Sequence, residues 1–76
     1  MVILSQSRRL ILKEFEDLFV QRYQKDRYIV GATPVSDKCE LYILGEYEDV
    51  ERCEEILYEI VEAYREDCQI FEMPKE

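Results

Sequence analysis

The clearest pattern of hydrophobic and polar positions lies in the second half of the chain. From residue 50 onward, apolar residues recur at steps of one and three, at Val50, Cys53, Ile56, Leu57, Ile60, Val61 and Tyr64. This spacing predicts an amphipathic α-helix over about residues 50–66. Asp49 is a preferred N-cap residue, and Glu51 falls in the first turn, where the helix dipole favours an anion. Since the remaining surface is acidic, this helix depends on packing of its apolar stripe.

The segments on either side of the helix have the composition of short β-strands. Residues 28–33 and 41–44 are runs of β-forming residues, each stopped by a proline or a glycine. Residues 24–27 are a polar break that suits a hairpin turn, and residues 35–38 have loop chemistry. A short final strand is predicted over about residues 69–73.

Residues 8–23 allow two interpretations. Leu10, Ile11, Phe15, Leu18 and Phe19 fit a helical stripe with Ser7 as its cap. The apolar triplets at residues 10–12 and 18–20 are equally compatible with two strands. The pattern alone favours the helix slightly.

The order of these signals resembles a family of small proteins of unknown function from phages, prophages and mobile elements of Gram-positive bacteria. The matching segments are Ile3–Ser7, Phe15–Asp17, Leu44–Cys53, Ile56–Ile60 and Phe71–Glu76. The more specific parts are Leu-Gly-x-Tyr at residues 44–47, before the helix, and Met-Pro at residues 73–74. The family offers no catalytic motif for transfer to this chain.

The resemblance implies a fold without a first helix. Residues 2–45 are then antiparallel strands, with turns at residues 5–9 and 15–17. The predicted fold is α+β, in a single domain of residues 1–76. It is an antiparallel β-meander of about four or five short strands over about residues 2–45, covered by one amphipathic C-terminal helix at about 50–66 and followed by the short final strand. The arrangement is physically reasonable because the apolar faces of a sheet and a helix bury each other.

Composition and charge narrow the classes of partner. The chain has 76 residues, which suffices for one small domain, and a net charge of −8. The charge is uneven: residues 1–39 carry +2 and residues 40–76 carry −10. A net negative charge disfavours binding to nucleic acid or to an anionic membrane. A basic protein fits better, although an acidic helix face that serves only solubility is the simpler explanation.

The location predicted for this chain is the cytoplasm of a bacterial host. No apolar run approaches the roughly 20 residues of a membrane span. The first residues also lack the basic-then-apolar order of a signal peptide. We therefore expect no membrane association.

The residues that most often carry catalysis or bind metals are scarce. The chain has no histidine, which removes the usual base near neutral pH and the commonest metal ligand. Cys39, Cys53 and Cys68 lack the spacing of a zinc site or redox pair and are expected to be reduced thiols. No glycine-rich phosphate loop is present. We therefore expect no enzymatic activity, cofactor or metal.

Two sets of residues are candidates for binding. The candidate interaction surface combines helix carboxylates with tyrosines, at Glu51, Glu55, Glu59, Glu62, Tyr47 and Tyr58. Tyrosine is enriched at interface hot spots, although a half-buried tyrosine in a thin core is the simpler reading. Arg8 and Arg9 are the candidate contacts for an anion.

The function expected from these features is stoichiometric protein–protein binding, for example inhibition of a host defence protein. One alternative is a sponge-like protein that binds a nucleotide or another small molecule, and another is a self-associating accessory phage protein. A homodimer is expected in any case. Residues 18–20 and 28–30 carry more apolar surface than one helix stripe covers, and a meander has open edges.

Overall fold

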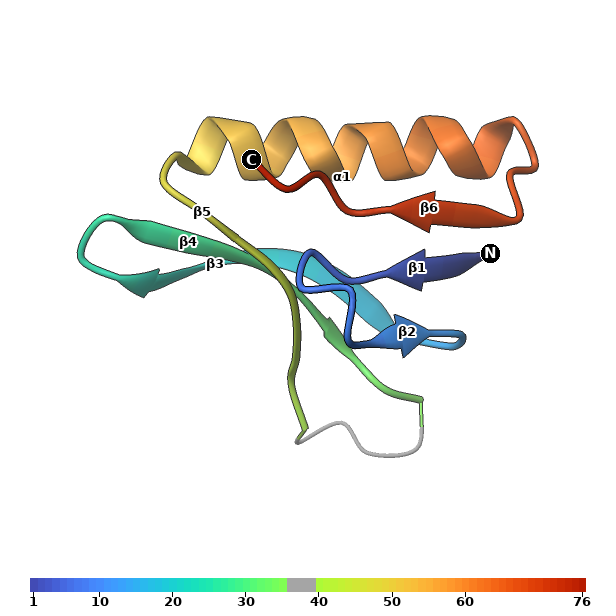
Figure 1. The fold of residues 1–76 in the computed structure, drawn as a ribbon, viewed down its shortest axis with the longest axis horizontal. Helices are drawn as coiled ribbons and strands as arrows, with labels where there is room; N and C mark the ends of the chain where they lie inside the picture. Colours follow the sequence, from blue (N-terminus) through green and yellow to red (C-terminus); the bar gives the residue numbers. More distant parts are fainter. Residues whose placement is uncertain (36–39) are drawn as a thin grey trace.

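The computed structural model describes residues 1–35 and 40–76. The elements in chain order are β1 (Val2–Leu4), β2 (Ile11–Leu12), β3 (Asp17–Gln24), β4 (Arg27–Thr33), β5 (Tyr42–Tyr47), α1 (Val50–Arg65) and β6 (Ile70–Glu72). The predicted α+β fold is confirmed: the strands come first, one helix follows them, and a short strand comes last (Figure 1). Cys39 and positions 36–38 of the predicted loop lie outside the described residues.

Three of the strands form an antiparallel meander in the order β3–β4–β5. Strands β3 and β4 are joined by a two-residue turn at Lys25 and Asp26, as the polar break predicted. Residues 8–23 contain no helix and hold β2 and most of β3, so the helical interpretation is wrong and the two-strand interpretation is confirmed. The physical reason is that both apolar triplets find strand partners: Leu12 pairs with Ile3, and Val20 pairs with Val30.

The remaining strands form a second sheet in the order β2–β1–β6. Strand β1 is antiparallel to β2 and parallel to β6. The amide of Val2 donates to the Gln69 carbonyl over 2.8 Å, just before β6 begins. The final strand therefore pairs with the first strand and does not extend the meander (Figure 1).

Gln6 connects the two sheets at the predicted turn of residues 5–9. Its amide N–H donates to the Leu44 carbonyl over 2.7 Å. Its side-chain amide accepts from the Glu46 N–H over 2.8 Å and donates to the Glu46 carbonyl over 3.1 Å. One glutamine thus satisfies main-chain groups along the edge of β5. The turn itself is closed by Arg8, whose φ of 65° lies in the left-handed region.

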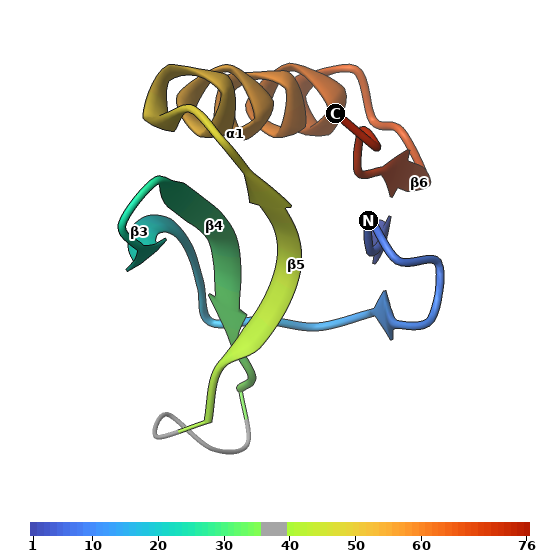
Figure 2. The ribbon, with the colours of Figure 1, turned by 60° about the vertical axis from the view of Figure 1, so that its left-hand side comes forward.

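The core lies between α1 and the two sheets (Figure 2). Its buried members are Ile3, Leu12, Val30, Ala32, Leu44, Tyr47, Cys53, Ile56, Ile60 and Met73. The helix begins as predicted, because the Asp49 carboxylate accepts from the Glu51 N–H over 3.0 Å. Val61 and Tyr64 belong to the predicted apolar stripe but are 45% and 72% exposed, so the buried stripe is narrower than expected. Within the described residues, α1 is too short and too polar to cross a membrane.

Candidate functional site

The outer face of α1 gathers five of the six residues predicted to form an interaction surface. We call Glu51, Glu55, Tyr58, Glu59 and Glu62 the acidic helix face. Glu51, Glu55, Tyr58 and Glu62 lie opposite the buried Cys53, Ile56 and Ile60 on a helix of 3.6 residues per turn, and Glu59 lies at the edge of the face, beside Arg52. The tyrosine is 64% exposed, and it is three or four positions away from Glu55 and Glu62. Side chains at those spacings are neighbours, so carboxylates surround an exposed aromatic ring.

Few cations offset the carboxylates of this face. Arg52 lies 3.3 Å from Glu59 and 3.8 Å from Glu55, and Arg65 lies 2.8 Å from Glu62. Exposed pairs of this kind stabilise a protein by about 0–1 kcal/mol each. Within the described chain, Glu51 and the adjacent Glu54 have no ion pair at all. The face therefore keeps a negative potential.

Tyr47 is not part of this face. Its side chain is only 3% exposed, and its hydroxyl donates to the Pro74 carbonyl over 2.6 Å. Burial raises the pKa of Tyr47 to about 12. The prediction that Tyr47 contributes to an interaction surface is therefore wrong, because the absent side chain of Gly45 leaves room for its ring inside the core.

This tyrosine joins the two segments that carried the family resemblance. The Leu-Gly-x-Tyr motif lies at the end of β5, and the Met-Pro motif follows β6. The Tyr47 hydroxyl of the Leu-Gly-x-Tyr motif donates to the Pro74 carbonyl of the Met-Pro motif. Met73 is fully buried beside this contact, and its N–H donates to the Leu4 carbonyl over 3.0 Å. The residues of both motifs therefore have structural functions in this fold.

Arg8 and Arg9 do not form a shared anion site. The Arg8 guanidinium donates to the carbonyls of Ser5 and Met73 over 3.1 and 2.8 Å, and it lies 3.7 Å from the carboxylate of Glu72. The N–H groups of the Arg8 guanidinium thus hold the segment after β6 against the turn of residues 5–9. Arg9 is exposed, and its main-chain N–H donates to the Ser7 hydroxyl over 3.3 Å. Neither arginine lines the cleft between β5 and the start of α1.

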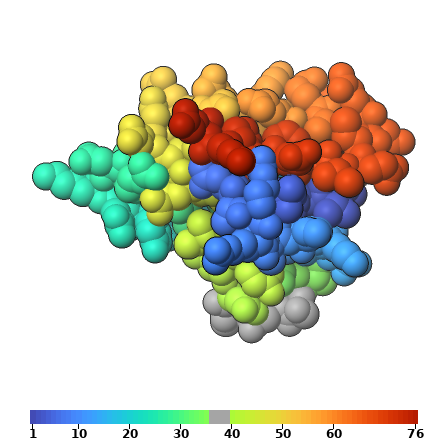
Figure 3. Space-filling view, viewed as in Figure 1, coloured from blue at the N-terminus to red at the C-terminus, as the bar shows by residue number. Residues whose placement is uncertain are grey.

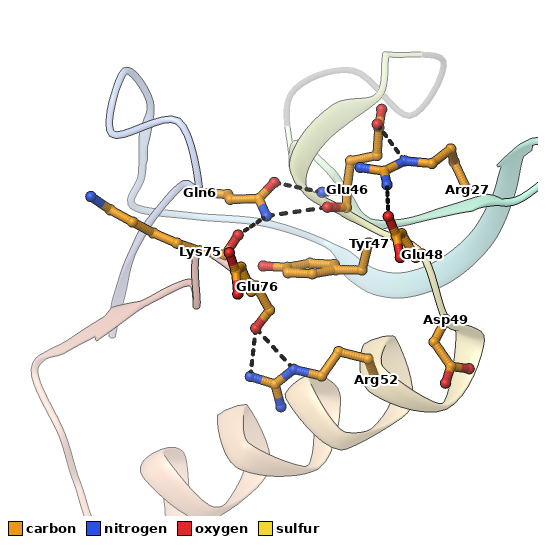
Figure 4. A pocket seen from close by; sticks show the side chains of 9 residues that line it. All are labelled: Gln6, Arg27, Glu46, Tyr47, Glu48, Asp49, Arg52, Lys75 and Glu76. Atoms are coloured by element: carbon orange, nitrogen blue, oxygen red, sulfur yellow. Dashed lines mark hydrogen bonds and ion pairs between the residues drawn. The ribbon is translucent and has the colours of Figure 1, made fainter.

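A cleft of about 750 Å³ opens where β5, the start of α1 and the segment after β6 meet (Figure 4). Its lining residues are Gln6, Arg27, Glu46, Tyr47, Glu48, Asp49, Arg52, Lys75 and Glu76. Sequence reasoning missed this cleft because its residues come from four distant segments of the chain.

Most of the cationic side chains in this cleft already bind acidic or carbonyl oxygens of the cleft itself. Arg27 lies 2.8 Å from Glu46 and 3.5 Å from Glu48. Arg52 donates twice to the main-chain oxygen of Glu76, over 3.0 and 3.1 Å (Figure 4). The lining has more carboxylates than cations, so it disfavours a phosphate-bearing ligand.

The two described thiols differ in exposure. Cys53 is buried, which raises its pKa and keeps the thiol protonated at neutral pH. Cys68 is a free, exposed thiol. Across residues 1–35 and 40–76, no group of three or more cysteine or carboxylate side chains is arranged to hold a metal ion.

Comparison with protein-family models, with curated protein sequences and with solved structures gives no match for this chain. The resemblance to small phage and mobile-element proteins therefore stays a prediction from the quoted segments.

Proposed function

We propose that this protein acts without catalysis, by stoichiometric binding of its acidic helix face to a basic surface on another protein. The observation that carries the proposal is the exposure of Tyr58. This side chain is 64% exposed, and no hydrogen bond or ion pair within the described chain involves it. No polar contact within the described chain uses this ring, which lies between Glu55 and Glu62 on the helix surface.

The chemistry of this face suits a cationic partner. A net charge of −8, concentrated in the second half of the chain, steers a basic protein toward the helix before contact. Tyrosine is one of the residues that most often anchor an interface, because it buries a large ring and keeps a polar hydroxyl. An arginine or lysine of the partner within about 6 Å of the ring centre also gains a cation–π contact.

The resemblance supplies the proposed biological setting. A phage or mobile-element protein in a bacterial cytoplasm meets host defence proteins, and a carboxylate-rich face resembles the phosphates that a basic defence nuclease binds. Self-association is part of the same proposal, because a homodimer presents two acidic helix faces to the partner. Nucleotide binding is less well supported, since the carboxylate-rich cleft and the engaged Arg8 offer no free anion site.

The test is site-specific photo-crosslinking in a lysate of the bacterium that carries the gene. A photoreactive phenylalanine replaces Tyr58 in one variant, and in the matched control it replaces Tyr23, which is 47% exposed on β3. We expect one predominant adduct from position 58, with a yield that falls as salt is added, and none of that adduct from position 23.

A charge variant completes the design. In the triple glutamine variant, Glu55, Glu59 and Glu62 are replaced by Gln, which keeps their size and removes three negative charges. We expect the adduct from position 58 to be lost in this background. Equal adducts from both positions, or an adduct that survives both added salt and the triple glutamine variant, would contradict the proposal.

A further inference from the structure

Strand β3 leaves one long edge of the meander open. It is the terminal strand in the order β3–β4–β5, and within the described residues no strand pairs with its other side. The opposite edge, on β5, is covered by Gln6, which bonds main-chain groups of Leu44 and Glu46. Strands β2 and β6, at the edges of the second sheet, are only two and three residues long. With eight residues, β3 therefore offers the longest described row of free main-chain donors and acceptors.

The core is also open along this edge. Leu18 and Val20 of β3 lie on the helix side of the sheet, as do their register partners on β4, Ala32 and Val30. The two β4 residues are fully buried, whereas the two β3 residues are only partly buried. One more strand beside β3 would cover both side chains.

One flank of α1 is apolar and largely uncovered. Leu57, Val61 and Tyr64 follow one another at steps of four and three, so they lie along one line of the helix. Leu57 is partly buried, and Val61 and Tyr64 are exposed. We call these three residues the open helix flank. Val61 lies about two and a half turns beyond Arg52, and so on the opposite side of the helix.

The open helix flank lies on the β3 side of the molecule. Arg52 donates to the main-chain oxygen of Glu76, so the segment after β6 covers the other flank (Figure 3). The helix packs over β3 and β4, and the flank opposite Arg52 faces the open edge of β3 (Figure 2). Tyr64 also lines a shallow cleft with Phe15, just before β3 begins. The edge of β3 and the open helix flank therefore form one continuous surface.

The charges along β3 suit a second copy that runs in the opposite direction. Residues 13–17, at its start, hold three carboxylates and one cation, and residues 22–27, at its end, hold three cations and one carboxylate. In an antiparallel pair of β3 strands, the acidic start of each lies beside the basic end of the other. The acidic helix face lies on another side of α1 and is turned away from this edge. Two copies can therefore meet here although each has a charge of −8.

We propose that two copies of this chain pair through β3, antiparallel about a two-fold axis, and form one six-stranded sheet with both helices on the same face. Adjacent strands are about 4.8 Å apart, so a helix above the space between β3 and β4 lies about 5 Å from the axis. The two helices are then about 10 Å apart, the usual distance between packed helices. The open helix flanks of both copies fill the space between them. The inference rests on the self-association part of the proposed function and not on the basic partner.

A second copy fits this surface better than an isolated strand of another protein. An isolated strand would bond the main chain of β3 but leave Val61 and Tyr64 exposed, whereas a second copy supplies a strand and a helix together. The pairing runs from Asp17 to Arg22, because the bulge beyond Arg22 interrupts the regular strand. It makes about six main-chain hydrogen bonds, which supply most of the affinity when a strand is added to a sheet.

The experiment is light scattering coupled to size exclusion, at about 10–300 µM protein, which covers weak association. We expect a mass that rises to twice the 9.2 kDa of the chain. Val61→Glu places two like charges between the paired helices and should give the monomer throughout. The matched control is Ile70→Glu, which changes the net charge equally at a 63% exposed position of the other sheet, and it should stay dimeric. Circular dichroism melts establish that each variant is folded.

Hydrogen exchange of the parent protein locates the contact without any substitution, and it decides the matter if Val61→Glu fails to fold. The amides of residues 17–22 that β4 does not bond should exchange about threefold more slowly at the highest concentration than at the lowest, and those of β2 and β6 should not change.

A parent protein that is monomeric at the highest concentration overturns the inference and leaves the edge of β3 to a strand of another protein. So does a dimer that survives Val61→Glu, one that dissociates in the Ile70 control, or slower exchange that is absent from β3. None of these results depends on a basic partner, so failure here is distinct from failure of the crosslinking test.

Discussion

Replacement of Gly45 by Ala tests the contact that joins the two motif segments. A Cβ atom at this position would lie 2.6 Å from the Tyr47 hydroxyl oxygen and 2.7 Å from its ring carbon Cε2. The ring has little freedom to move, because it is 3% exposed and its hydroxyl is bonded to the Pro74 carbonyl. The glycine has no positive φ, so the backbone itself accepts alanine.

The magnitude follows from two terms. Overpacking of a filled core costs about 1–3 kcal/mol, and displacement of the ring leaves the Pro74 carbonyl without its donor, for about 1–3 kcal/mol more. We expect Gly45→Ala to lower the free energy of unfolding by about 2–6 kcal/mol in total. Each kcal/mol lowers the Tm of a domain of this size by about 4–8 °C.

A double-mutant cycle shows whether the ring is the cause. With Tyr47→Ala in place, the added methyl group has no ring to meet, and Gly45→Ala should be neutral or stabilising by about 0.5–1 kcal/mol, because glycine weakens a strand. The parent, the two single variants and the double variant are all melted in a stabilising osmolyte. The osmolyte keeps the Tyr47→Ala variants folded, because loss of a buried aromatic side chain alone costs about 3–5 kcal/mol.

The reasoning fails if the two changes are additive. A cost for Gly45→Ala that is the same in both backgrounds, within about 0.5 kcal/mol, would show that the tyrosine ring does not require the glycine. The Leu-Gly-x-Tyr segment would then need another explanation.

Three further predictions concern the helix and the buried tyrosine. Ile56→Ala should cost about 2–5 kcal/mol in urea unfolding because it leaves a cavity, whereas Val61→Ala, at a position 45% exposed, should change stability by less than about 0.5 kcal/mol; equal losses would contradict the assigned core. The folded pKa of Tyr47, about 12, lies above the unfolded value of 10.0, so the stability it contributes is full below pH 10 and is lost as pH rises through about 12. Unfolding at alkaline pH followed by tyrosinate absorbance checks this, and Tyr47→Phe should remove that part of the slope. The triple glutamine variant should melt within about 1 kcal/mol of the parent, because its ion pairs are exposed; if it unfolds, those carboxylates serve the fold.

The sequence predicted best those elements whose residue pattern depends only on neighbouring positions in the chain. The helix follows from its periodicity and from the Asp49 cap, both of which are local properties of the chain. The turn at Lys25 and Asp26 follows from local polarity in the same way. The exposure of Val61 was not predictable, because it depends on how far the sheets extend beneath the helix.

The division into two sheets was beyond local reasoning. Strands of two or three residues carry almost no pattern of their own, and their partners are set by packing of the whole chain. The functions of Arg8 and Tyr47 depend on the same long-range packing, since both bond carbonyls of residues 73–74. The sequence predicted that Arg8 contacts an anion and that Tyr47 lies on the surface. In the structure, both side chains instead donate hydrogen bonds to residues 73–74 and hold that segment in place.

The parallel pairing of β1 with β6 has a consequence for how the protein folds during its synthesis. Translation makes β1 first among the described elements, and β6 leaves the ribosome after all the others. The meander and α1 form from neighbouring segments, but Ile3 reaches Phe71 only once the intervening chain has been made. Closing so long a loop is slow compared with forming a hairpin. A nascent chain therefore exposes the apolar side chains of β1 until β6 emerges, and the native core is completed only after residues 70–73 have left the ribosome.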